Sequence, residues 1–320
     1  MANDIEAEID RRVARVMGVY VRTPEVRAAN EVIERTRKLR RQRGKAFCSL
    51  ITGLSGCGKS RIFELYAESQ PEPEPDTMPV LVFETPSPFS FSAILDAMLT
   101  AMGVEGFPGR HNVAKMRARV LYYLDKLKVQ LILMEEVQHI IDQKERSAKI
   151  PYWALDFIKL YLLDTAKVPL VMNGLPIAKD LFVINPQMKQ RRYRTVELTP
   201  YDGADPIRRA QFMLLLEMFE VEAGFPMAVL KGNETLCSRV LRATLGIHGE
   251  VTKLIVEAID IGMRKGATGL TTEVLALAHA SLSVPEKGWV NPILVDVAPP
   301  AASPDETRVT ALNKRPKKAA

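Results

Sequence analysis

One stretch near residue 50 restricts the fold of this chain more than any other feature. The apolar run AFCSLIT (46–52) leads directly into the glycine-rich sequence GLSGCGKS (53–60), and the helical pattern RIFELYAE follows it. The spacing matches GxxxxGK(S/T) placed between a strand and a helix, the context in which this motif binds phosphates. Its glycines permit backbone conformations and close approaches that a Cβ atom would block. The stretch therefore predicts a strand, a phosphate-binding loop and a helix within an α/β fold.

This loop gives individual residues expected roles. Its backbone N–H groups and the N-terminus of the following helix would point at anionic phosphates. Lys59 should reach the β- and γ-phosphates, and Ser60 should ligate Mg²⁺. The predicted nucleotide-binding residues are Gly53, Ser55, Gly56, Cys57, Gly58, Lys59, Ser60 and Arg61. We therefore expect ATP and Mg²⁺ as cofactors.

Four further apolar runs, at 80–83, 129–134, 168–172 and 195–198, predict additional strands. Amphipathic helical patterns lie between them, and one of these has Asn112 as its expected N-cap. Continuous apolar strands that alternate with helices indicate a parallel sheet covered on both faces. We expect a five-stranded P-loop α/β domain over residues 46–200.

Helical patterns flank this domain on both sides. An N-terminal helical segment is expected over residues 1–45, with Thr23 and Pro24 starting one helix. A small helical lid domain is expected over residues 201–283, its first helix capped by Asp205. Residues 284–320 are rich in proline and should be mostly disordered, although the apolar stretch WVNPILVDV within them can dock a partner.

Polar side chains at the ends of the later strands complete the predicted site. Glu135 and Glu136 follow the run LILM, at the strand end where ligands bind in open α/β sheets. The first would belong to the Mg²⁺ shell, and the second would polarise the attacking water. Asn173 ends the next strand and can orient that water. Arg191 and Arg192 precede the last strand, where an arginine can reach a neighbouring subunit's γ-phosphate.

Composition and charge narrow the class of protein. The chain has 320 residues and a net charge of +6, and seven basic residues with no acidic one lie between Arg35 and Lys45. Such a segment attracts phosphate backbones, although a solvated helix face has the same appearance. No run of about 18 apolar residues is present, which excludes a membrane span. The acidic N-terminus lacks the features of a signal peptide, so we expect a cytoplasmic, nucleoid-associated protein.

The cysteines and histidines exclude two other classes of site. Cys48, Cys57 and Cys237 are scattered, and no cysteine or histidine has the spacing of metal ligands. Neither a disulfide framework nor a structural zinc site is therefore expected.

Together these features resemble the AAA+ ATPases, and within them the TniB/TnsC family of transposition ATPases, which are MuB-like target-selection proteins. The resemblance covers about residues 15–280 and rests on YVRTPEVRAANEVI, GLSGCGKS, LILMEEVQHII, VPLVMNGLP and NPQMKQRRYR. It implies an ATPase that oligomerises as a helical filament on duplex DNA. It also implies that the filament recruits a transposase, with a target-selection adaptor as a further partner.

The resemblance also assigns roles by position. It makes Glu135 the metal-side acid, Glu136 the residue that activates water, Asn173 the sensor, and Arg191 or Arg192 the finger that acts on a neighbouring subunit. In such filaments the α/β domain contacts DNA. The candidates here lie between the second and third strands and mostly off the apolar stripe: Lys115, Arg117 and Arg119.

Three other functions remain open from the sequence. One is an AAA+ helicase loader or replication initiator, although no helix-turn-helix module is apparent. Another is a nucleotide-gated signalling or scaffold NTPase, which would commonly carry effector or repeat domains that are not seen here. The third is a small-molecule kinase, for which no acceptor pocket can be argued.

Overall fold

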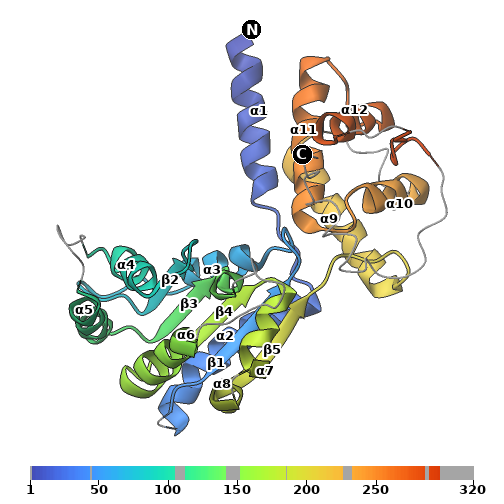
Figure 1. Cartoon of the computed structure of the whole chain (residues 1–320). Coiled ribbons are helices and arrows are strands. Elements are labelled where there is room, and N and C mark those ends of the chain that lie inside the picture. Colours follow the sequence, from blue (N-terminus) through green and yellow to red (C-terminus); the bar gives the residue numbers. More distant parts are fainter. Residues whose placement is uncertain are drawn as a thin grey trace, which may run out of the picture. The chain divides into compact units, whose positions relative to one another are not determined.

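The computed structural model describes residues 2–43, 45–104, 112–141, 152–184, 186–225, 233–284 and 288–295 (Figure 1). The chain forms two compact units. One is an α/β unit of residues 22–199, and the other is a helical unit that combines residues 1–21 with residues from 200 onward. Among the described residues, no helix has the length and apolar character needed to cross a membrane.

A five-stranded parallel sheet forms the centre of the α/β unit, which confirms the predicted fold class. The strands are β1 (Cys48–Gly53), β2 (Val80–Glu84), β3 (Leu131–Glu135), β4 (Leu170–Gly174) and β5 (Arg192–Leu198). Their order across the sheet is β2-β3-β4-β1-β5, and every neighbouring pair is parallel. Because Ile51 pairs with Asn173 and Met134 pairs with Met172, the carboxyl ends of β1, β3 and β4 lie at the same edge.

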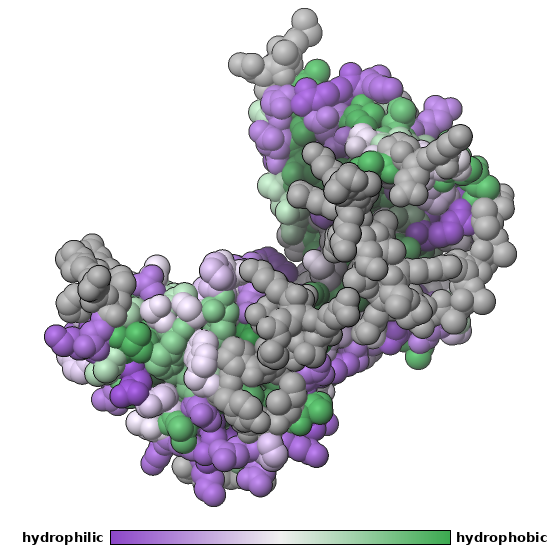
Figure 2. All heavy atoms as spheres, in the orientation of Figure 1, coloured by the Kyte–Doolittle hydropathy of each residue, from purple (hydrophilic) through white to green (hydrophobic). Residues whose placement is uncertain are grey.

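Helices cover both faces of this sheet, as expected for parallel strands. They are α2 (Pro24–Arg43), α3 (Lys59–Glu68), α4 (Phe91–Ala101), α5 (Val113–Lys126), α6 (Tyr152–Asp156), α7 (Asp180–Ile184) and α8 (Pro186–Arg191). Three short elements complete the unit: η1 (Val137–Ile140), the π-helical η2 (Phe157–Thr165) and η3 (Pro176–Lys179). Every residue of β1 is buried, because β1 lies inside the sheet. Figure 2 shows hydrophilic residues interspersed with smaller hydrophobic patches on the visible surface of this unit.

Helix starts follow the sequence signals. The hydroxyl of Thr23 accepts a hydrogen bond from the Val26 N–H at 3.3 Å, and α2 begins at the next residue, a proline. Asn112 caps α5, since its Oδ1 accepts the Ala114 N–H at 3.0 Å. These caps satisfy backbone donors that a helix leaves without partners at its N-terminus.

The helical unit consists of α1 (Ala2–Met17), α9 (Pro206–Ala223), α10 (Glu234–Ala243), α11 (His248–Arg264) and α12 (Thr272–Leu282). Its core is built from apolar side chains that these helices bury together, among them Val16 of α1, Phe212 and Phe219 of α9, and Ile255 of α11. Residues from the two ends of the chain therefore share one core.

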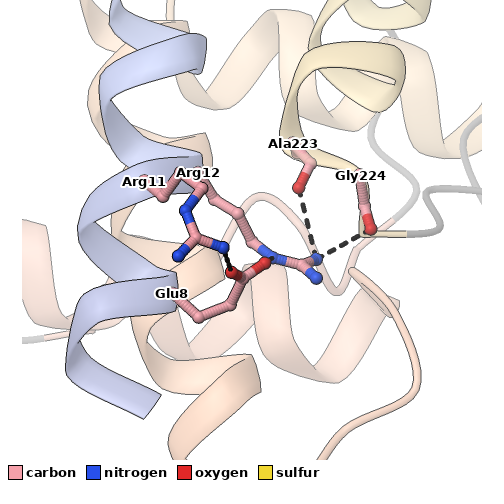
Figure 3. A network of polar contacts seen from close by, with 5 residues as sticks. All are labelled: Glu8, Arg11, Arg12, Ala223 and Gly224. Carbon is pink, nitrogen blue, oxygen red and sulfur yellow. Dashed lines mark hydrogen bonds and ion pairs between the residues drawn. The ribbon is translucent and has the colours of Figure 1, made fainter. Parts of the chain in front are cut away.

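Polar contacts also join α1 to the end of α9 (Figure 3). The Arg12 guanidinium donates to the carbonyl oxygens of Ala223 at 3.2 Å and Gly224 at 2.7 Å. Glu8 holds the same guanidinium through a 2.7 Å bond to its Nε. A cation at a helix C-terminus satisfies carbonyls that have no partner within the helix.

A short segment after α12 lies against the helical unit. Ile293 is fully buried, and Arg242 of α10 donates to the Pro292 carbonyl at 2.7 Å. The buried Asn291 donates to the Ala276 carbonyl at 2.7 Å. Part of the stretch WVNPILVDV thus contacts its own chain, whereas residues 296–320 of the expected tail lie outside the described residues.

Candidate nucleotide-binding site

The glycine-rich loop connects β1 to α3 as the sequence predicted. Gly53 ends β1, and Gly56 and Gly58 have φ values of 80° and 86°, a left-handed conformation that favours glycine. Gly58 is the N-cap of α3 and provides no side-chain cap. The first turn of α3 therefore presents its N–H groups to the loop, an arrangement that suits a bound anion.

Lys59 lies inside this loop, with only 5% of its surface exposed. Its ammonium donates to the carbonyl oxygens of Gly53 at 3.1 Å and Leu54 at 3.0 Å. Burial lowers the pKa of Lys59, and the charges of Glu136 and Glu135 partly oppose that effect. The side chain is thus a desolvated cation close to two carboxylates. A phosphate group would compete with the two carbonyl oxygens for the hydrogen bonds that this ammonium donates.

Ser60 and Glu135 meet at the carboxyl end of β3. The Ser60 hydroxyl donates to Glu135 Oε2 at 2.5 Å. Burial raises the pKa of Glu135, against the opposing effect of this hydrogen bond. Oxygen ligands of this kind suit Mg²⁺, which is usually held in nucleotide sites by one or two protein groups together with phosphates and water. The pair fits such an ion, and among the described residues no cluster of three or more acidic, histidine or cysteine side chains could hold a metal alone.

Glu136 and Asn173 meet beside this pair. Glu136 has a φ of 53°, which is uncommon for a residue with a side chain, and its N–H donates to Asn173 Oδ1 at 3.1 Å. Asn173 is fully buried, and its Nδ2 has no hydrogen-bond partner within the described residues. The amide of Asn173 lies close enough to the Glu135 carboxylate to lower its pKa, but the two groups do not have the geometry of a full hydrogen bond. Backbone strain and an unpaired buried donor are both common at functional sites.

Gln138 is a residue of this site that the sequence analysis missed. It lies on η1 and donates from Nε2 to the Glu136 carboxylate, while its Oε1 accepts the Leu175 N–H at 3.0 Å. The only sequence signal was a glutamine between the acidic pair and the apolar residues Ile140 and Ile141.

The side chains of Ser55, Cys57 and Arg61, which were also predicted to bind nucleotide, have surroundings that differ from one another. Ser55 is exposed. Arg61 forms ion pairs within its own helix, with Glu64 at 2.9 Å and Glu68 at 3.5 Å. Burial raises the pKa of the Cys57 thiol, which makes it a poor nucleophile near neutral pH.

The two candidate arginines differ in their surroundings: Arg191 ends α8, and Arg192 is the first residue of β5, so it does not precede the strand as predicted. Arg191 forms an ion pair with Asp164 of η2, and Lys159 lies 3.4 Å from the same carboxylate. Arg192 is exposed, with its guanidinium 5.6 Å from the centre of the Phe182 ring. Arg192 is therefore the more accessible of the two.

The three basic candidates on α5 also differ. Lys115 is exposed. Arg117 donates to the Tyr161 hydroxyl at 2.6 Å and lies over that ring, and Arg119 lies over the ring of Tyr123. The cation of Lys115 is the one of the three presented most fully to solvent.

The basic segment of α2 is partly engaged within the chain. Arg35 and Lys38 form ion pairs with glutamates one turn earlier, at 2.5 Å and 3.0 Å. Arg37 donates to Gln130 at 2.8 Å and to Gln70 at 2.5 Å. The side chains of residues 40–43 lie outside the described part of the chain.

Comparison with solved structures shows what fold surrounds this site. The Aeropyrum pernix ORC1 protein in complex with DNA superposes with a TM-score of 0.60 at 17% identity, covering 82% of this chain and 66% of that one. The Aeropyrum pernix ORC2 protein in its ADPNP–ADP complexes gives 0.58 at 13%, covering 82% and 68%. Drosophila ORC bound to DNA gives 0.54 at 13%, covering 86% and 66%. At these identities the likeness shows the fold alone, which is the AAA+ fold.

Comparison at the level of sequence gives the family. No curated protein sequence matches this chain. The family model described as "Bacterial TniB protein" matches residues 18–202, which is more than half of the chain and includes every residue of the site above. The chain therefore belongs to the TniB family.

Proposed function

We propose that this chain is an ATPase that assembles on duplex DNA when ATP is bound and recruits a transposase to the target. The observation that carries the proposal is the convergence of Lys59, Ser60, Glu135 and Glu136 at one edge of the sheet, beside the glycine-rich loop. A cation, an oxygen pair that fits Mg²⁺ and a second carboxylate are the groups that phosphoryl transfer to water requires.

Each side chain would have a distinct task in hydrolysis. Lys59 would exchange its loop carbonyls for phosphate oxygens, and Ser60 with Glu135 would hold Mg²⁺, which when bound neutralises phosphate charge. Glu136 would accept the proton of the water that attacks the γ-phosphorus. Asn173, whose Nδ2 has no partner within the described residues, would orient that water.

Assembly would complete the site. We propose Arg192 as the group that reaches a neighbouring subunit's γ-phosphate, because Arg191 is already held by Asp164. A finger contributed by a neighbour would make hydrolysis depend on the oligomer, which we propose is a helical filament on DNA.

Duplex DNA is the proposed template for this filament. Lys115 is the exposed one of the three basic candidates on α5, and two of the structures with the same fold are DNA complexes. The transposase, a target-selection adaptor and a place on the nucleoid in the cytoplasm are proposed on the basis of the family match.

A second candidate is an AAA+ initiator or helicase loader. The likeness to the ORC proteins favours it, and the match to the TniB family model favours transposition instead. The two candidates differ in the assembly that they predict, since a loader would act as a ring or partial ring and would not coat DNA continuously.

Fluorescence anisotropy of a labelled duplex tests the proposal. We expect tight binding with a slowly hydrolysed ATP analogue and weak binding with ADP. Lys59→Ala should remove this difference, whereas Lys265→Ala, which changes an exposed lysine on the helical unit, should keep it. Equal binding of DNA with both nucleotides, or a Lys59→Ala protein that behaves as wild type, would contradict the proposal.

A further inference from the structure

The turn after β3 buries one polar side chain among apolar neighbours. Gln138 is 6% exposed, and Val137 and Ile140 of the same turn, η1, are almost fully buried. A buried amide needs partners for both its oxygen and its nitrogen, because each unpaired polar group costs free energy. Gln138 has such partners at both ends.

These partners fix which end of the amide faces which way. The Leu175 N–H can only donate, so the atom 3.0 Å from it must be the amide oxygen of Gln138. The NH₂ group is then directed at the Glu136 carboxylate, which can only accept when ionised. Gln138 therefore presents a donor to Glu136 and cannot reverse without losing both bonds.

The same amide is closely packed against the end of β4. A Cβ atom added to Gly174 would lie 2.6 Å from Gln138 Oε1, so a side chain there would have to displace this amide. Asn173, the preceding residue, accepts the Glu136 N–H. Glu136 is thus held at its backbone by Asn173 and at its carboxylate by Gln138, and both contacts lead to the end of β4.

We infer that Gln138 is a positioning residue, which holds the Glu136 carboxylate in place for proton transfer from water and ties it to β4. The inference rests on the proposed hydrolytic function. Gln138 would act through Glu136 and would not contact the nucleotide, so its loss should lower kcat and leave nucleotide affinity nearly unchanged.

Two substitutions separate positioning from structural support. Gln138→Glu keeps an oxygen for the Leu175 N–H but replaces the donor facing Glu136 with a second carboxylate. Gln138→Leu removes both bonds at similar volume. Gln211→Glu, the same change at a half-exposed position on α9, is the matched control.

We expect kcat for ATP hydrolysis to fall by about 10- to 100-fold in both Gln138 variants, the loss that follows from removing one hydrogen bond to a charged group. The Kd for a fluorescent ATP analogue should stay within about threefold of wild type, because Gln138 would make no contact with the bound nucleotide in the ground state.

The exchanged pair Glu136→Gln with Gln138→Glu provides a readout that does not depend on activity. It restores the hydrogen bond with donor and acceptor reversed, so its Tm should recover relative to the single variants while hydrolysis stays low. A Gln138→Glu protein with the kcat of wild type would overturn the inference and leave the proposed function intact. A wild-type protein that hydrolyses no ATP, with or without DNA, would instead overturn the proposed function. If the Tm change of the exchanged pair equals the sum of the Tm changes of the two single variants, the contact between Gln138 and Glu136 itself is overturned.

Discussion

Replacing Gly174 by alanine perturbs the proposed catalytic carboxylate without touching it. The added Cβ would lie 2.6 Å from Gln138 Oε1 and 3.1 Å from a methyl group of Val137. Oε1 is the end of a flexible side chain, but the Leu175 N–H and the Glu136 carboxylate both hold that amide. It can move away only by lengthening these two bonds. We therefore expect Gly174→Ala to reduce both stability and hydrolysis.

The expected loss of stability follows from the crowding. An extra methyl group in a well-packed interior costs about 1–3 kcal/mol. For a unit of this size each kcal/mol lowers the Tm by about 2–4 °C, so the shift should be about 2–12 °C. Displacement of the Glu136 carboxylate should lower kcat by about tenfold or more, the value of one lost hydrogen bond to a charged group.

Differential scanning fluorimetry and steady-state ATPase assays measure the two effects. Gly103→Ala is the control. Nothing lies within 4 Å of its added Cβ, so the substitution is destabilising only because a φ of 70° disfavours a side chain. It should lower the Tm by a comparable amount and leave kcat unchanged. Gly174→Ala with Gln138→Ala should recover part of the Tm but no activity. A Gly174→Ala protein with wild-type kcat would refute the reasoning.

Three further outcomes follow from the site. Glu136→Gln should bind nucleotide as wild type but hydrolyse it about 100-fold more slowly or worse, measured by single-turnover phosphate release. Arg192→Ala should lower the DNA-stimulated hydrolysis rate by about 1,000-fold and regain activity when mixed with Lys59→Ala subunits. Arg191→Ala should mainly lower the Tm. A mixture without recovery would argue against a finger acting between subunits. Burial raises the pKa of Glu135 above its ordinary value of 4.5. The folded protein is therefore more stable when Glu135 is protonated, and this stabilisation is lost as the pH rises through the folded-state pKa. Glu135→Gln should therefore melt above wild type at pH 7, with a difference that narrows towards pH 4; a constant difference would contradict that cause.

Local chemistry explains why so much of the nucleotide site could be predicted. The loop between β1 and α3 depends on residues that are adjacent in the sequence, and the helix caps at Thr23 and Asn112 depend on contacts two or three residues away. Parallel pairing then places the ends of β3 and β4 beside the loop, which brings Asn173 to Glu136.

Contacts between distant residues explain what the sequence could not give. The start of β5 was predicted at residue 195, whereas the strand begins at Arg192, because an edge strand with alternating exposure resembles a polar loop. Arg37 belongs to a run that suggested DNA contact, but its guanidinium binds Gln130, which lies far along the chain. The roles of Gln138 and Arg12 likewise depend on backbone groups of Leu175 and Gly224 that no local pattern marks.

Assembly on DNA that depends on the triphosphate is tested most directly by negative-stain electron microscopy. The full chain would be mixed with duplex DNA and either ADP or a slowly hydrolysed ATP analogue, with Lys59→Ala treated in the same way. We predict continuous helical coating of the DNA with the analogue alone, and none with Lys59→Ala. Closed rings or monomers that form regardless of DNA and nucleotide would contradict the proposed function.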